Sequence, residues 1–129
     1  MKKTRRYFKD IYPAGPTYAR AIRTGDFLFI SGCTARGSNA QGSSPIDQLK
    51  VILDRITRMV AKEGGKPSDI VKFTTYVTNI NNWWPITGNH KEIYDQYFNG
   101  EFPTNSIVEV TSLAEPGLDI EIEATAMLD

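Results

Sequence analysis

FPTNSIVEV (Phe102–Val110) and LDIEIEATA (Leu118–Ala126), two stretches near the C-terminus, decide the fold of this chain. The second stretch alternates apolar and polar residues, with Ile120, Ile122, Ala124 and Ala126 on one side and Glu121, Glu123 and Thr125 on the other. Because side chains alternate across a strand, this pattern predicts a strand with one buried face. The two carboxylates therefore belong to a strand rather than a loop, and we expect both stretches to form strands at one pocket wall.

Three further elements are predicted upstream. Two apolar-rich runs, residues 18–23 and 27–31, flank the turn Thr24-Gly25-Asp26 and predict a β-hairpin. A helix is expected to begin at Ser44-Pro45, as N-cap and first helical residue, and to end at Gly64-Gly65. Residues 70–77 predict another strand, since Val71, Phe73, Thr75 and Val77 alternate with Lys72, Thr74 and Tyr76.

A second helix is predicted to open at Asn81–Pro85 and to close at Gly100. Its inner side would carry Ile86, Ile93, Tyr94, Tyr97 and Phe98. The order β-β-α-β-α-β-β predicts an α+β fold, a mixed sheet with both helices packed on one face. We expect residues 15–129 to form a single domain and residues 1–14 to be an N-terminal tail, with the basic hexamer Met1–Arg6 solvated.

Several of these motifs together resemble a known family. Gly15-Pro16 with Tyr18, Ser31-Gly32, Gln48 and the two C-terminal stretches are similar to the YjgF/RidA family of imine and enamine deaminases, over about residues 15–127. The resemblance implies a chorismate-mutase-like fold and a homotrimer whose three sheets close a central barrel, with pockets at the subunit boundaries. The apolar character of Val108, Val110, Ile120 and Ile122 agrees with a covered second sheet face.

One position departs from the family pattern. The usual motif is Pro-Ala-Arg followed by Ser, Thr or Cys, and its arginine binds the substrate carboxylate; here Asn105 stands at that position. An arginine binds a carboxylate bidentately, whereas an asparagine amide carries no charge. The chain is therefore expected to belong to a divergent branch whose substrate is not a simple 2-imino acid.

The resemblance also implies site residues. Glu121 corresponds to the glutamate that activates a water for attack on a C=N bond, a task that suits a partly desolvated carboxylate. Tyr18, Ser31 and Gly32 correspond to residues that contact substrate, and Asn105, Ser106 and His90 are further candidate substrate-binding residues. A structural role in an interface stays open for Glu121, as do packing for Tyr18 and capping for Asn105.

Three other residues have open roles. His90 lies four residues before Tyr94, where arginine-lacking branches of the family carry a histidine, and either an acid–base or a packing role fits it. Lys91 stands where the more typical branch has asparagine. Cys33 follows the Ser31-Gly32 turn, and without an activating base it is expected to be a structural thiol. Arg36–Ser43 is expected to be a mobile loop, either a connector or a lid.

Composition excludes several classes of protein. Fifteen basic and fifteen acidic residues give a net charge of zero, so the chain has no overall charge that would steer nucleic acid or an anionic membrane to it. We expect no nucleic-acid partner and no membrane span. One histidine, one cysteine and no phosphate-binding loop predict neither metal nor cofactor. The lone cysteine and the absence of an apolar signal core predict a cytoplasmic location.

Three functions are consistent with these observations. The leading interpretation is a deaminase-like hydrolase that acts on a small enamine or imine metabolite. The alternative is a trimer that binds a small metabolite without turnover and has a regulatory role. Endoribonuclease activity, attributed to some relatives, is disfavoured by the neutral charge. The physiological substrate is left open, as is the choice between hydrolysis and tautomerisation.

Overall fold

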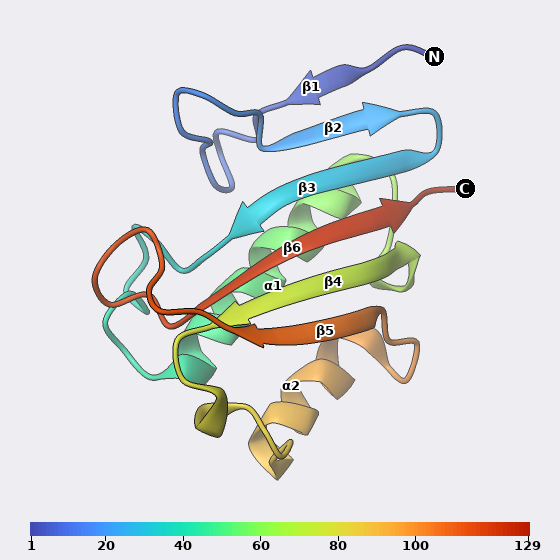
Figure 1. Cartoon of the computed structure of the whole chain (residues 1–129). Coiled ribbons are helices and arrows are strands. Elements are labelled where there is room, and N and C mark those ends of the chain that lie inside the picture. The colour runs from blue at the N-terminus through green and yellow to red at the C-terminus, as the bar shows by residue number, and fades with distance from the viewer.

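A six-stranded mixed sheet carries both helices on the same face (Figure 1). The computed structural model describes all 129 residues. Neighbouring strands follow the order β1-β2-β3-β6-β4-β5, and every pair is antiparallel except β4 and β5. The strands are β1 (Thr4–Arg6), β2 (Ala21–Thr24), β3 (Phe27–Cys33), β4 (Ile70–Val77), β5 (Thr104–Glu109) and β6 (Ile120–Met127). The α+β prediction is confirmed.

Helix α1 (Pro45–Lys62) forms where the sequence predicts it. The Ser44 hydroxyl accepts a hydrogen bond of 3.2 Å from the Asp47 N–H, and Pro45 occupies the first turn. The apolar stripe packs on the central strands, with Leu49, Leu53, Ile56 and Val60 fully buried. On the facing strand β6, Ile120, Ile122, Ala124 and Ala126 are buried, as the alternation predicts. This contact forms the core of the protein.

Helix α2 (Gly88–Phe98) begins later than predicted. Thr87 is its N-cap and accepts from the His90 N–H, while Ile80–Asn82 forms a separate short 3₁₀ turn. Ile86 therefore lies outside the helix and is 46% exposed rather than on the inner side. The predicted end is confirmed, because Asn99 and Gly100 both adopt left-handed φ angles, 48° and 86°.

Strand β4 contains a bulge that the sequence did not predict. The pairing of β4 with β6 shifts register between Ile70 and Lys72. Ile70 is buried and Val71 is 42% exposed, so Val71 does not share the buried face of Phe73 and Val77. An extra residue in one strand reverses the side-chain alternation on one side of it.

The N-terminal segment is not the expected tail. Thr4–Arg6 forms β1, which pairs antiparallel with β2, and Tyr12 is only 4% exposed. Pairing of β1 satisfies the backbone groups at the edge of β2. Arg6 and Arg23 also share one carboxylate, that of Glu63, at 3.2 and 3.4 Å. The positive charge of this end of the chain is thus partly neutralised within the protein.

The sheet face away from the helices carries exposed apolar side chains. They are Phe27, Phe29, Val108 and Met127, each more than 40% exposed. Ile120 and Ile122, which we expected to contribute to a second covered face, instead lie under the helices. The reason is the strand alternation: Glu121 and Glu123 occupy the open face of β6.

Two loops meet at one end of the sheet, residues 34–44 after β3 and residues 110–119 before β6 (Figure 1). The Gly42 N–H donates to the Gly117 carbonyl at 2.9 Å. Gln48, a buried residue of α1, links the two loops. Its Nε2 donates to the carbonyls of Ser43 and Gly117 at 3.1 Å each and to Asp119 Oδ2 at 2.7 Å. Neither helix of the structure is long and apolar enough to cross a membrane.

Candidate functional site

A cavity of about 410 Å³ lies on the open face of the sheet, where β3 and β6 meet the two loops. It brings together four of the residues singled out from the sequence: Tyr18, Ser31, Gly32 and Glu121. Its other lining residues are Tyr12, Thr34, Arg36, Ala114, Leu118 and Glu123.

Glu121 is the half-buried carboxylate of this cavity. Burial raises the pKa of Glu121 above its usual value, the neighbouring Glu123 raises it further, and Arg20 acts in the opposite direction. Its side chain packs directly on Gly32, where a Cβ would lie 2.7 Å from Glu121 Cδ. A carboxyl with a raised pKa can take a proton from water and return one to a leaving amine.

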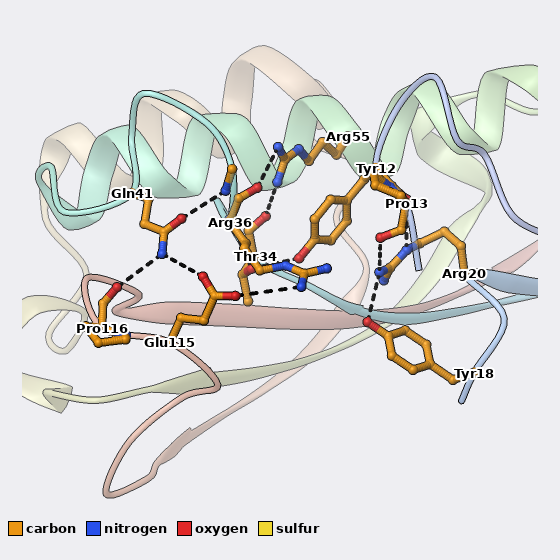
Figure 2. Close-up of polar contacts among 11 residues, drawn as sticks. Tyr12, Pro13, Tyr18, Arg20, Thr34, Arg36, Gln41, Arg55, Glu115 and Pro116 are labelled. Atoms are coloured by element: carbon orange, nitrogen blue, oxygen red, sulfur yellow. Dashed lines mark hydrogen bonds and ion pairs between the residues drawn. The ribbon is translucent and has the colours of Figure 1, made fainter. Parts of the chain in front are cut away.

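Arg20 bonds two residues that line the cavity, Tyr18 and Gly32, and was not among the residues singled out from the sequence. Its fully buried guanidinium donates to the carbonyls of Tyr12 at 3.2 Å, Pro13 at 3.2 Å and Gly32 at 2.8 Å. It also donates to the Tyr18 hydroxyl at 3.3 Å. Figure 2 shows its bonds to Pro13 and Tyr18. Together the four bonds hold Tyr18 and Gly32, which line the cavity. One sequence signal for Arg20 was available: it is a charged residue directly before Ala21 in an apolar hairpin.

Tyr12 forms the back of the cavity. Its ring lies between the guanidinium groups of Arg20 and Arg55, each 4.2 Å from the ring centroid (Figure 2). Its hydroxyl is 2.9 Å from Thr34 Oγ1. Tyr12 lies in the segment that was expected to be a tail, and no sequence pattern around it indicates that this segment folds back on the sheet.

Asn105 and His90 lie elsewhere, together on the other face of the sheet. Thr75 Oγ1 donates to Asn105 Oδ1 at 2.9 Å, and Thr75 is buried on the helix-covered face. Asn105 lines a cavity of about 260 Å³ with His90, Lys91 and Tyr94. The remaining lining residues there are Ile86, Phe102, Pro103 and Ile107. A second hollow of about 480 Å³ adjoins it, lined by Asn105 with Ile80, Trp84, Ile86 and Ile107.

Ser106, the next residue of β5, is exposed and lines neither the cavity of Glu121 nor those of Asn105. Strand alternation directs it to the sheet face opposite Asn105. Within one chain, therefore, the predicted site residues fall into separate groups on the two faces of the sheet.

His90 is almost fully buried. Its ring packs edge-on against Trp83 and Tyr94, at centroid distances of 5.3 and 5.2 Å. Its Nδ1 has no hydrogen-bond partner, and burial lowers the pKa of His90. This environment favours a neutral imidazole at neutral pH. Burial likewise raises the pKa of Tyr94 to about 12.

Cys33 and Lys91 contribute little chemistry. Cys33 is fully buried, and burial raises the pKa of its thiol to about 12, so the thiolate is scarce at neutral pH. Lys91 is paired with Asp95 at 2.8 Å. Nowhere do three His, Cys, Asp or Glu side chains come together in a group that could hold a metal ion.

Comparison with known proteins agrees with this fold. A family model described as Endoribonuclease L-PSP matches residues 9–128. A RutC family protein of Pyrococcus horikoshii is 34% identical over 118 residues, 88% of each chain. A protein of Dermatophagoides farinae named 2-iminobutanoate/2-iminopropanoate deaminase is 27% identical over 120 residues, 91% of this chain and 89% of its own.

Among solved structures, Rv2704 of Mycobacterium tuberculosis, described as a member of the YjgF/YER057c/UK114 family, superimposes with a TM-score of 0.79. It is 31% identical, and the match covers 98% of this chain and all of that one.

Proposed function

The chain belongs to the Endoribonuclease L-PSP family, the YjgF/RidA family of the sequence resemblance, and from this premise we propose that it is a deaminase-like hydrolase of a small imine or enamine. The observation that carries the proposal is the half-buried Glu121 carboxyl, whose pKa is raised, in a cavity shared with Tyr18, Ser31 and Gly32. A relative named as a 2-iminobutanoate/2-iminopropanoate deaminase supports the reaction class.

The proposed reaction replaces C=N with C=O. Glu121 takes a proton from water as the water oxygen bonds to the carbon of the protonated imine, which gives a neutral carbinolamine. Glu121 then passes this proton to the nitrogen. The C–N bond breaks as the carbinolamine hydroxyl gives its proton to Glu121, and the carbonyl compound and ammonia leave, with ammonia taking that proton as ammonium and restoring the Glu121 carboxylate. An enamine enters the same route after protonation at carbon. No cofactor is needed, because water and the proton transfers at Glu121 balance the reaction: a protonated imine and water give a carbonyl compound and ammonium.

We propose that the protein assembles as a homotrimer with sites between subunits. Asn105 and Glu121 lie on opposite faces of the sheet in one chain, so a site that contains both needs two copies. Exposed Phe27, Phe29 and Met127 on the open face support burial by another sheet. A reducing, cytoplasmic location is part of the proposal and is supported by the single, buried thiol of Cys33.

Asn105 restricts the substrate. Its amide carries no charge and is already bonded to Thr75, so a carboxylate next to it lacks the bidentate partner that an arginine supplies. The substrate is therefore proposed not to be a simple 2-imino acid. The same observation favours the second candidate, a trimer that binds a small metabolite without turnover. Endoribonuclease activity is disfavoured by a net charge of zero.

A deamination assay tests the proposal. Imines are generated in situ by an amino-acid oxidase or an amine oxidase, and the unreacted imine is trapped with semicarbazide. We expect the protein to accelerate loss of at least one imine, and Glu121→Gln to lower kcat by about 100-fold or more. The exposed Glu101→Gln is the matched control and should keep full activity. Light scattering should give the same mass for all three proteins.

Two outcomes separate the candidates. If no imine is consumed faster than in buffer while a metabolite still binds, the protein is the non-catalytic binder. If Glu121→Gln retains the rate, the cavity on the open face is not the reaction site.

A further inference from the structure

We propose that Arg36 binds the negative group of the ligand in the Glu121 cavity, so that the substrate is an imine or enamine bearing a carboxylate held by residue 36. This inference rests on the proposed function of the same cavity. Position 105 carries no cation, and Arg36 lines the one cavity that contains Glu121. The specificity of the site would then come from the loop after β3.

The backbone of Arg36 is firmly held. Arg55 on α1 donates to the Thr34 carbonyl at 2.6 Å and to the Arg36 carbonyl at 3.0 Å. The Arg36 N–H donates to Thr34 Oγ1 at 3.1 Å. The start of the loop is thus fixed to α1 (Figure 2). This fixed backbone positions the Arg36 side chain, which lines the cavity.

The Arg36 guanidinium remains available to a ligand. Its side chain is 35% exposed, and it lies between the Glu115 carboxylate, 3.7 Å away, and the Tyr12 ring, whose centroid is 5.7 Å away (Figure 2). A distance of 3.7 Å exceeds a hydrogen bond, and a partly exposed ion pair of this kind is weak. Contact with Tyr12 is the main cause that raises the pKa of Arg36, so the group is always cationic.

The other cations near the predicted site residues are less suitable. Arg20 is fully buried, and its N–H groups already donate to backbone carbonyls and to the Tyr18 hydroxyl. Arg55 already donates hydrogen bonds to two backbone carbonyls. Lys91 lies on the helix-covered side with Asn105 and is paired with Asp95. Of these cations, Arg36 alone lines the cavity of Glu121 and donates no side-chain hydrogen bond within the protein.

Charge orients the ligand. Glu121 and Glu123 both line this cavity and repel an anion. Arg36 is the one cation of the lining, and its weak, partly exposed pair with Glu115 can be replaced by a ligand carboxylate. A guanidinium can hold it with two parallel N–H···O bonds. The C=N group of the same molecule is then directed toward Glu121.

Binding of stable carbonyl analogues tests the inference without turnover. Protein-observed NMR titration compares 2-oxobutanoate and 4-oxopentanoate, in which the carboxylate lies at different distances from the carbonyl, with their methyl esters. We expect wild-type protein to bind at least one acid about tenfold or more tightly than its ester, and Arg36→Gln to reduce that preference to twofold or less. Arg36→Lys, which keeps the charge but not the fork, should retain part of the preference.

Arg58→Gln is the matched control, because Arg58 is an exposed arginine on α1, paired only with Asp54, and lines none of the cavities described. It should bind the acids as wild type does. The thermal transition of each variant verifies that it is folded.

The outcomes are distinguishable from those of the deamination assay. An acid preference that persists in Arg36→Gln, or no preference in wild type, overturns the role of Arg36 even where imines are hydrolysed. An acid preference lost in Arg36→Gln supports the role of Arg36 even where no imine is consumed, in which case only the proposed turnover fails.

Discussion

The carboxyl group of Glu121 rests against the Cα of Gly32, and no side chain fits at residue 32 while Glu121 keeps this position. The two residues come from neighbouring strands, β6 and β3, whose register is irregular between Ile30 and Cys33. Because glycine has no Cβ, Gly32 lets the Glu121 carboxyl approach the backbone of β3 beside the cavity.

Substitution of Gly32 by alanine should displace the Glu121 carboxyl. Gly32 does not have a left-handed φ, so alanine causes no backbone strain of its own there. We expect kcat/KM for the imine substrate to fall by about 100-fold, the lower range for loss of a general acid–base group. Gly88→Ala, where an added Cβ meets nothing within 4 Å, is the control. Equal activity of the two variants would contradict the role of this contact.

Replacement of Asn105 by arginine should restore the charge that the family motif has. We expect kcat/KM for 2-iminobutanoate to rise ten- to a hundredfold, about 1.4 to 2.7 kcal/mol. Ser106→Arg is the matched control, because Ser106 is the adjacent residue on the opposite sheet face and should show no gain. A gain by Ser106→Arg alone would show that a different face of β5 meets the substrate.

His90 should make the protein sensitive to acid. Burial lowers the pKa of His90 in the folded state below its usual value of 6.5, so the unfolded state binds a proton first as pH falls. The stability contribution is present above pH 6.5 and is lost as pH falls through the lowered pKa. We expect the free energy of unfolding, measured by denaturant titration, to decline from pH 7 to pH 5.

His90→Phe should decline less over the same range, since it keeps an aromatic ring between Trp83 and Tyr94 without the titrating group. Parallel pH profiles for the two proteins would contradict this account of His90.

Loss of the Gln48 amide should destabilise the end of the sheet that forms the cavity. Gln48 is fully buried and bonds both loops and Asp119, so alanine leaves buried polar groups without partners. We expect Gln48→Ala to lower the free energy of unfolding by about 2 to 3 kcal/mol. Gln41→Ala removes solvent-exposed bonds to Glu115 and Pro116 and should cost less than about 1 kcal/mol.

Local sequence patterns were sufficient to predict most of the helices and strands. Helix α1 was predicted from its cap, its apolar stripe and its terminal glycines, and β6 from its alternation, because each signal lies within a few residues of chain. The start of α2 was misplaced, since Trp83-Trp84-Pro85 suggests a helix start and the true cap, Thr87, is a less distinctive residue. The bulge at Val71 has no local signal, because it arises from pairing with β6.

The candidate site was only partly predictable. Glu121, Tyr18, Ser31 and Gly32 were singled out through family motifs, and they lie together in the structure. Tyr12, Arg20 and Arg36 were missed. Tyr12 and Arg36 line the cavity, and Arg20 bonds Tyr18 and Gly32, which line it. The N-terminal segment and the loop after β3 converge there through contacts between residues far apart in sequence, which no local pattern encodes.

By itself, the amino-acid sequence determined where α1 and strands β2 to β6 form, which face of β6 is buried, and that no cation stands at position 105. Only the tertiary structure decided that Asn105 and Glu121 lie on opposite faces of one sheet and that Arg36 shares the cavity of Glu121. The physical reason is the range of the interactions: periodicity and capping act within one or two turns of chain, whereas strand order, register and the meeting of loops depend on contacts between residues far apart in sequence.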